Sequence, residues 1–349
     1  MPSDYTWRSL GGWGRSTSSF ARTATVVPDD IASHLKDADA RGVAIRGLGR
    51  SYGDPAQNAG GMVLSLSGSV SDAVLDEEAA TVTVGAGTSL DELMRVIVPR
   101  GFFVPVSPGT RYVTVGGAIA SDIHGKNHHV EGSFGNHLRR MRIALADGRT
   151  VEASASENPD LFWATIGGMG LTGAILDATF SLLRIETSRC IVDTIRCPDF
   201  DGLIEQMSNG DDNVRYSVAW VDLLATGGRF GRSVLWRGDH ARSDDLPIGQ
   251  RSDPLSYSPR QVVSVPPFMP SRGVVNSLTS TLFNEVWFRK EPVRRVAGIK
   301  SIPAYFHPLD AVGSWNRLYG RHGFVQYQFV VPFGREAEFR RIEIGRAHV

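Results

Sequence analysis

Glycine-rich loops constrain this chain more than any other feature of its sequence. The chain has 38 glycines in 349 residues, and they cluster before residue 175, where they interrupt short apolar segments. Glycine accepts a positive φ angle and lets the backbone approach a ligand closely. Several such loops in one domain predict backbone N–H groups gathered around a phosphate-bearing cofactor. The alternative, which any single loop favours, is a set of tight turns without a ligand.

Neither standard nucleotide-binding motif fits these loops. Gly-Leu-Gly at 47–49 follows a predicted strand, but Gly53 and Pro55 prevent a helix from starting there. Gly-Ala-Gly at 85–87 also follows a strand, yet Leu90 occupies the position of the third glycine. The sequence pattern of a P-loop does not occur either. The cofactor site is therefore expected to be of another kind.

Composition excludes several classes of protein. The formal net charge is zero, which argues against a nucleic-acid-binding protein, because such proteins need a basic surface. Cys190 and Cys197 are the only cysteines and cannot build a zinc cage or a disulfide framework. The sequence shows no apolar run as long as a membrane span, and residues 1–20 lack the apolar core of a signal peptide. We expect a protein that is cytoplasmic or peripheral to the plasma membrane, with the periplasmic face as an alternative.

Periodicity in the first half predicts an α+β arrangement. A strand–helix–strand unit is predicted at 24–46, a short helix at 158–164, and strands at 62–66, 81–84, 138–145, 150–153 and 174–183. A helix is predicted to open at Thr88, with Asp91 as the partner in a capping box, and to end at Gly101. The apolar residues at helical spacing predict one buried stripe made of Leu90, Leu93, Met94, Ile97 and Val98.

The composition changes near Glu186, where glycine gives way to tryptophan, arginine and proline. We therefore predict two domains, 1–186 and 187–349. The second is expected to contain a long mobile loop at 244–275, a strand at 324–332 and a helix from Arg335. That helix would carry Phe339 and Ile342 on one face but has no capping residue before Val349. We expect the chain to be truncated and residues 345–349 not to be native.

Several motifs together resemble the FAD-linked oxidases of the vanillyl-alcohol-oxidase superfamily, and within it the branch that oxidises decaprenylphosphoryl ribose. The motifs are GWGR at 12–15, RGLGRSYGD at 46–54, PGTRYVTVGGAIA at 108–120, DIHGKNHH at 122–129, GSFGNH at 132–137, LFWATIGGMGLTG at 161–173, HPLD at 307–310 and QYQF at 326–329. HGKNHH and QYQF are the specific ones. The resemblance implies a two-part FAD-binding domain of the PCMH type, followed by a substrate domain built on an antiparallel sheet.

The resemblance also implies which residues bind FAD, without a covalent link. Gly47 and Gly49 would present amides to phosphate oxygens, and a helix opening at Thr114 would place its N-terminus beside the same anion. The implied cofactor-binding residues are Arg46, Gly47, Leu48, Gly49, Arg50, Ser51, Tyr52, Gly53, Gly109, Thr114, Val115, Gly116, Gly117, Ser121, Asp122, Ile123, His124, Gly125 and Ile175.

For the substrate, the resemblance implies a polyprenylphosphoryl ribose whose 2-hydroxyl is oxidised to a ketone. Lys126 would bind the anionic phosphoribose, because a compact ammonium suits phosphate. Tyr52, Gln326 and Gln328 would face the sugar hydroxyls, since alternate residues of a strand share one face. For the two glutamines, a polar sheet edge is the alternative, and for Lys126 a solvated loop position.

His124 and Lys126 are the predicted catalytic residues. A histidine near this position is covalently joined to the flavin in some members of the superfamily, whereas the resembling branch binds its flavin non-covalently. A metal site is a further alternative, because His128, His129 and His137 lie close by in the sequence, but these histidines lack a clear pairing with carboxylates. We expect no metal.

The sequence departs from the branch at some positions. Ser121 stands where some relatives carry cysteine, and Val218 replaces a polar residue near the substrate phosphate. The branch carries further flavin-facing residues beyond the position that corresponds to Val349, and the catalytic base lies there in one interpretation. The resemblance also implies a partner, an NADH-dependent short-chain reductase that completes an epimerisation.

Peripheral contact with a membrane is a separate expectation. Five basic residues and a single acid lie between Val286 and Lys300, near the apolar loop 266–270. A basic segment beside an apolar loop suits an anionic bilayer surface, and a solvated basic loop is the alternative. Two rival functions remain open: an alditol or sugar-lactone oxidase of the same superfamily, and a flavin-free protein that binds polyprenyl-phosphate sugars.

Overall fold

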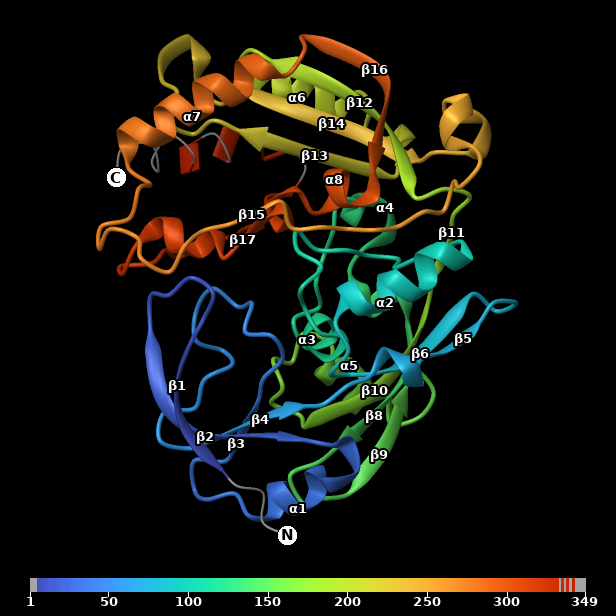
Figure 1. The fold of residues 1–349 in the computed structure, drawn as a ribbon, viewed down its shortest axis with the longest axis vertical. Coiled ribbons are helices and arrows are strands. Elements are labelled where there is room, and N and C mark those ends of the chain that lie inside the picture. Colours follow the sequence, from blue (N-terminus) through green and yellow to red (C-terminus); the bar gives the residue numbers. More distant parts are fainter. Residues whose placement is uncertain (1–4, 333, 336, 339–340, 343–349) are drawn as a thin grey trace.

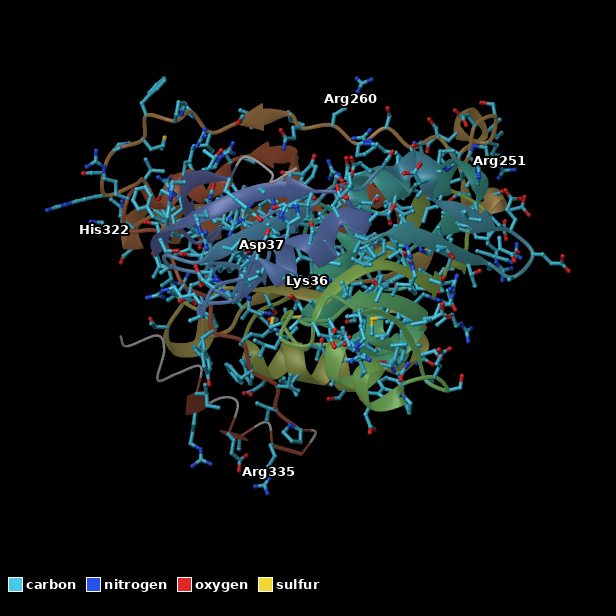
Figure 2. All side chains as sticks on the ribbon, turned by 90° about the horizontal axis from the view of Figure 1, so that it is seen from below. Lys36, Asp37, Arg251, Arg260, His322 and Arg335 are labelled. Carbon is cyan, nitrogen blue, oxygen red and sulfur yellow. The ribbon has the colours of Figure 1, made fainter. Side chains whose placement is uncertain are left out.

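A computed structural model of the chain describes residues 5–332, 334–335, 337–338 and 341–342. The third of the three main sheets lies at one end of the long axis of the molecule, and the first and second sheets lie side by side toward the other end, with helices between and around them (Figure 1). Lys36 and Asp37, at the end of helix α1 (Ile31–Lys36), lie at the end remote from the third sheet and face the viewer in Figure 2. The mixture of helices with largely antiparallel sheets confirms the predicted α+β class.

The first sheet is built by the N-terminal segment and has the order β1-β2-β4-β3. Its strands β2 and β3 both run parallel to β4, and β1 runs antiparallel to β2. Helix α1 lies between β2 and β3, so the predicted strand–helix–strand unit is confirmed. The bounds are β1 Thr6–Gly11, β2 Ser18–Val26, β3 Val43–Ile45 and β4 Met62–Leu66.

The second sheet is antiparallel and has the order β5-β6-β10-β8-β9. Its core side is covered by helices α2 (Leu90–Ile97) and α3 (Val115–Ala120), with α5 (Pro159–Thr165) against β9. A smaller apolar cluster that includes Met62, Leu64, Ala174 and Leu176 joins this sheet to the first one. The strand bounds are β5 Val74–Asp76, β6 Thr81–Gly85, β8 Leu138–Ala144, β9 Thr150–Ser154 and β10 Ala174–Ser181.

The predicted stripe on α2 is confirmed, but its cap lies one residue later than predicted. All five stripe residues are fully buried. Ser89, not Thr88, is the N-cap, and its side chain and that of Glu92 bond each other's backbone N–H groups. Glu is the preferred partner at this position of a capping box, so the better local match decides the register. Gly101 ends the following turn with a φ of 82°.

The third sheet is antiparallel, in the order β13-β14-β12-β16. Helix α6 (Phe200–Ser208) packs on one face, and α8 (Ile302–Phe306) joins the main core on the other. Tyr216, Cys190 and Val192 of that second face share the core with α2 and α3, so the sheet is joined to the N-terminal part by apolar packing. The strands are β12 Arg189–Cys197, β13 Tyr216–Val221, β14 Ser233–His240 and β16 Arg294–Ser301.

Two paired segments, residues 262–265 and 309–315, form a strap that crosses between the third sheet and the N-terminal part (Figure 1). Strand β15 (Val263–Ser264) pairs in parallel with β17 (Val312–Gly313) within it. Helix α7 (Ser277–Lys290) lies beyond the strap, on the outside of the molecule. The predicted loop 244–275 is therefore mostly irregular but contains β15 and two single-turn helices.

The predicted strand at 324–332 is wrong. Residues 324–332 have no regular secondary structure, although apolar and polar residues alternate at 325–329. Val325, Tyr327 and Val330 are exposed, so the alternation has no sheet face to bury against. The predicted C-terminal helix is described only at 337–338 and 341–342, which are helical; Phe339 and residues 345–349 lie outside the described residues.

Candidate active site

A cavity of about 1060 Å³ lies where the first sheet, the second sheet and the strap meet. Its size is that of a large small-molecule or cofactor site. The strap contributes 309–310 and 312–315, and the irregular C-terminal segment contributes Gln326 and Gln328. The predicted cofactor-binding residues that line the cavity are Arg46, Gly47, Leu48, Gly49, Arg50, Ser51, Tyr52, Gly53, Gly109, Thr114, Gly116, Gly117, Ser121, Ile123, His124 and Ile175.

The loop after β3 supplies free backbone donors to this cavity. In the described part of the chain, none of the N–H groups of residues 47–53 donates to a protein acceptor. The loop is shaped by Arg46, whose guanidinium donates to the carbonyls of Gly11 and Ala56 at 2.7 and 2.8 Å. Gly49 has a φ of 65°, and a Cβ there would lie 2.2 Å from the Arg46 side chain. A row of unpaired amides around a cavity fits an anion such as a pyrophosphate.

The N-terminus of α3 lies at the same cavity but contributes differently than predicted. Thr114 caps the helix as expected, and its hydroxyl accepts from the N–H of Gly117 at 3.1 Å. Val115 donates to the carbonyl of Thr88, and Gly116 to that of Ala86, both at 2.9 Å. These three amides are thus paired within the protein, so the two glycines provide close packing rather than free donors.

Three predicted cofactor residues do not line the cavity. Val115 is fully buried in the core. Asp122 turns its carboxylate away and accepts from the hydroxyl of Ser133 at 2.7 Å and from the N–H of Gly135 at 2.9 Å. A Cβ on Gly125 would lie 2.7 Å from the carbonyl oxygen of Ser107, so Gly125 permits a close backbone approach. Asp122 and Gly125 hold the DIHGKNHH loop in place.

His124 lines the cavity where the DIHGKNHH loop meets the C-terminal segment. Its Nε2 lies 3.0 Å from Nε2 of Gln328. Burial lowers the pKa of His124 below its ordinary value of 6.5, and the nearby His128 lowers it further. The histidine is therefore neutral at physiological pH. Within the described residues, no group of three or more potential metal-ligating side chains comes together.

Lys126 lies outside the lining of this cavity. Its ammonium is 5.9 Å from the ring centroid of Tyr305, on α8. Burial, and to a smaller degree the charge of Lys300, lower the pKa of Lys126 from 10.5 to about 8. The lysine still carries its charge at neutral pH.

Aromatic side chains form one wall of the cavity. The Arg50 guanidinium lies 3.9 Å from the ring centroid of Trp13 and 5.5 Å from that of Tyr112. The ring of Tyr52 contacts Phe324 at 4.9 Å between centroids, and burial raises the pKa of its hydroxyl. Stacked cations and aromatic faces of this kind can hold the planar rings of a dinucleotide.

Asp310 is a cavity residue that the sequence analysis did not assign. Its carboxylate accepts from the hydroxyl of Thr110 at 2.7 Å and from the backbone N–H of Arg111 at 2.9 Å. The guanidinium of Arg111, 1% exposed, bridges Asp310 at 3.3 Å and Asp91 at 2.5 Å. The HPLD motif that ends in Asp310 was the available signal, but its partner could not be read from the sequence. Trp13 and Trp315 were missed as lining residues in the same way.

Comparisons with known proteins agree with this geometry. A family profile of the FAD binding domain matches residues 26–154. The chain is 42% identical over 343 residues to the decaprenylphosphoryl-beta-D-ribose oxidase of Mycolicibacterium smegmatis, covering 97% of this chain and 74% of that protein. It is 36% identical over 263 residues to a Streptomyces coelicolor protein described as "uncharacterized protein in mprA 5'region", covering 73% of this chain and 70% of that one. It is 32% identical over 108 residues to the FAD-linked oxidoreductase OXR1 of Pyricularia oryzae, covering 31% and 21%.

Proposed function

The chain belongs to the family of FAD-linked oxidoreductases that includes decaprenylphosphoryl-beta-D-ribose oxidase, and from this membership we propose that it oxidises a sugar of the same kind. The substrate is decaprenylphosphoryl-β-D-ribose, and the product is the 2-keto sugar. This reaction is the first half of the 2-epimerisation that gives the arabinose donor for cell-wall arabinan. The NADH-dependent short-chain reductase that completes the epimerisation is the proposed partner.

The free amides at 47–53 are the observation that carries the proposal. They face a cavity large enough for a dinucleotide, and the matched FAD binding domain includes them. In our proposal, residues 47–53 hold the pyrophosphate, and Arg50, Trp13 and Tyr112 hold an aromatic ring. FAD is bound without a covalent link, in a two-part domain of the PCMH type formed by residues 1–186, with residues 187–349 as the substrate domain.

FAD, when bound, would supply the two-electron chemistry that oxidises the C2 alcohol of the ribose to a ketone, and the proton of that hydroxyl must pass to a base. The chain orients the sugar and receives that proton. His124 is suited to the second task, because it is neutral and lines the cavity, and the substrate hydroxyl would replace Gln328 as the donor to its unprotonated Nε2. Gln328 orients its ring, Tyr52 and Gln326 bond sugar hydroxyls, and Lys126 attracts the phosphate beyond the His124 end of the cavity.

Contact with a membrane surface is also part of the proposal, because the polyprenyl tail of the substrate is insoluble in water. In the described residues, no helix combines the length and apolarity that crossing a bilayer needs. Helix α7 has its apolar side outward instead: Leu278, Leu282 and Val286 are 79%, 65% and 60% exposed. An exposed apolar helix stripe suits the interface of a bilayer.

The inner side of α7 makes polar contacts with residues that follow β13 and precede β14. Asn284 donates to Asp222 at 2.6 Å, and Glu285 pairs with the buried Arg232 at 2.6 Å. Of the five basic residues predicted to face a membrane, four are exposed: Arg289 and Lys290 on α7, and Arg294 and Arg295 on β16. Lys300 instead lies on the inner sheet face and is unsuited to that role. Co-sedimentation with anionic vesicles should fall when Leu278 and Leu282 are replaced by Ser, and equal sedimentation of the variant would remove the membrane contact from the proposal.

Flavin bleaching tests the proposed function against its rivals. FAD-loaded protein is mixed without oxygen with farnesylphosphoryl ribose, or with a free alditol or sugar lactone. We expect the flavin absorbance to disappear only with the phosphoryl ribose. Bleaching by the alditol or lactone alone would support the rival oxidase. A protein that takes up no FAD would support the flavin-free binding protein.

A further inference from the structure

The four lysines of the chain fall into two classes. Lys36 and Lys290 are exposed, whereas Lys126 and Lys300 are half-buried. In the described part of the chain, neither Lys126 nor Lys300 has a carboxylate within ion-pair distance. A sequestered ammonium without a counter-ion costs free energy, so two of them near each other need an explanation.

Lys126 and Lys300 approach the same face of the third sheet from different directions. Lys126 comes from the DIHGKNHH loop, and its carbonyl accepts from the N–H of Ser217 on β13 at 2.8 Å. Lys300 lies on β16 opposite Cys190, which is buried in the main core, so its side chain is on the face that packs against the N-terminal part. Tyr305, the ring beside Lys126, follows Lys300 by five residues.

Unpartnered ring nitrogens lie around the two lysines, and Glu291, whose charge raises the pKa of Lys300, is not within ion-pair distance of it. Lys300 lies 5.1 Å from the ring centroid of Trp236, whose Nε1 is buried and has no partner among the described residues. Nδ1 of His307, which Lys126 influences electrostatically, is buried and unpartnered as well. Burial lowers the pKa of both lysines, and Lys300 lowers that of Lys126. Two coupled cations beside an unpaired indole N–H provide the chemistry of an anion site.

We propose that Lys126 and Lys300 form a phosphate-binding subsite, which takes the phosphodiester of the polyprenylphosphoryl sugar. The identity of this phosphate rests on the proposed function, whereas the anion site rests on the two lysines and Trp236. Lys126 alone leaves the phosphate without a second contact on the sheet, and Lys300 provides it. A bound phosphate would neutralise the mutual repulsion of the two ammonium groups, so each lysine strengthens the contribution of the other.

Calorimetric titration with farnesyl phosphate tests the subsite without any turnover. FAD-loaded protein is compared with Lys126→Gln, Lys300→Gln and the double variant. We expect each single substitution to raise the dissociation constant for farnesyl phosphate at least about tenfold. In the double variant this constant should rise by less than the product of the two single effects, because both lysines act on one anion. Unchanged affinity in Lys300→Gln would overturn the proposal.

Matched controls identify the source of any effect. Lys290 makes the same lysine–tryptophan contact, with Trp287 at 5.1 Å, but on the exposed helix α7. Lys290→Gln should bind farnesyl phosphate as the parent protein does, and an equal loss there would contradict the subsite. Lys300→Arg keeps a cation and should restore most of the affinity, which separates charge from folding.

Further ligands separate the two sources of phosphate. Farnesol lacks the anion and should bind all variants equally; a Lys300→Gln loss with farnesol would overturn the proposal. If inorganic phosphate binds as tightly as farnesyl phosphate, the subsite serves free phosphate, and its assignment to the lipid substrate is wrong. If farnesyl phosphate binds through both lysines but farnesylphosphoryl ribose bleaches no flavin, the subsite stands and the proposed function fails.

Discussion

Nε2 of Gln328 lies 3.0 Å from Nε2 of His124, and this contact joins the C-terminal segment to the DIHGKNHH loop. The amide nitrogen of Gln328 can only donate, so Nε2 of His124 accepts and its proton sits on Nδ1. Burial and His128 lower the pKa of His124, and the hydrogen bond from Gln328 favours the same neutral form. The pair therefore keeps a neutral imidazole in the cavity.

Replacing Gln328 by Leu should move the acid limb of the pH–kcat/KM profile. The parent protein should lose activity only as the pH falls through the lowered pKa of His124, below 6.5. Without the hydrogen bond that pKa rises toward its ordinary value, so the limb should move up by roughly half a pH unit. Gln326→Leu, on the same segment, should change KM but leave the limb in place. If the acid limb does not move in Gln328→Leu, the titration of His124 does not control the measured activity.

Asp310 should be worth more to stability than any exposed carboxylate. Asp310→Ala removes three hydrogen bonds that join the strap to the loop before α3, one of which comes from the buried Arg111 guanidinium. We expect the free energy of unfolding in urea to fall by about 3 kcal/mol. Glu152→Gln breaks the surface pair with Arg140 and should cause little change. Equal effects of the two substitutions would show that the Arg111 bridge contributes nothing to stability.

Local patterns predicted most elements that bury a complete apolar face. The stripe on α2 needed only residues 90–98. The segment 324–332 failed because strand formation depends on a partner strand, which is a property of the whole fold. Its alternating sequence is instead held by the contact of Gln328 and by the N–H of Phe324, which donates to the carbonyl of Gly14 at 2.7 Å.

The candidate site also has some features that could be predicted from the sequence and others that could not. The glycine loop at 46–53 was predictable, because glycine residues indicate that the backbone itself approaches a ligand. The pairing of the α3 amides was not, since Thr88 and Ala86 come from a different segment. Asp310 and Arg111 are 199 residues apart, and their contact exists only once the strap crosses the N-terminal part. Long-range pairs of this kind cannot be derived from one sequence.

Gly47→Ala should weaken FAD binding. A Cβ at Gly47 would lie 2.4 Å from the hydroxyl of Thr114, so the loop must move away from α3. Overpacking of this kind costs about 1–3 kcal/mol, and we expect the dissociation constant of FAD to rise roughly tenfold. Gly228→Ala, where a Cβ meets nothing within 4 Å, is the control. Fluorescence titration of the apoprotein with FAD measures both, and equal affinities would argue against a pyrophosphate at this loop.

The titration of Lys126 should make KM rise at high pH. Its ammonium attracts the phosphate only while it is protonated, and its pKa is lowered to about 8. KM for farnesylphosphoryl ribose should therefore rise above pH 8, approaching roughly tenfold for each further pH unit, whereas kcat changes less. Lys126→Arg should keep KM flat over this range. Because the folded pKa lies below that of the unfolded chain, stability should increase between pH 8 and 10.5, and a decrease caused by Lys126 would contradict the assignment.

The position of the oxidised carbon is the most direct test of the proposed reaction. FAD-loaded protein converts farnesylphosphoryl-β-D-ribose, and the product is reduced at once with borodeuteride. We predict deuterium at C2 of the sugar only, in a mixture of ribose and arabinose epimers. Deuterium at another carbon would show that the sugar is not oxidised at C2. A sugar without deuterium, from protein that binds FAD and farnesyl phosphate, would show that the protein does not oxidise this substrate.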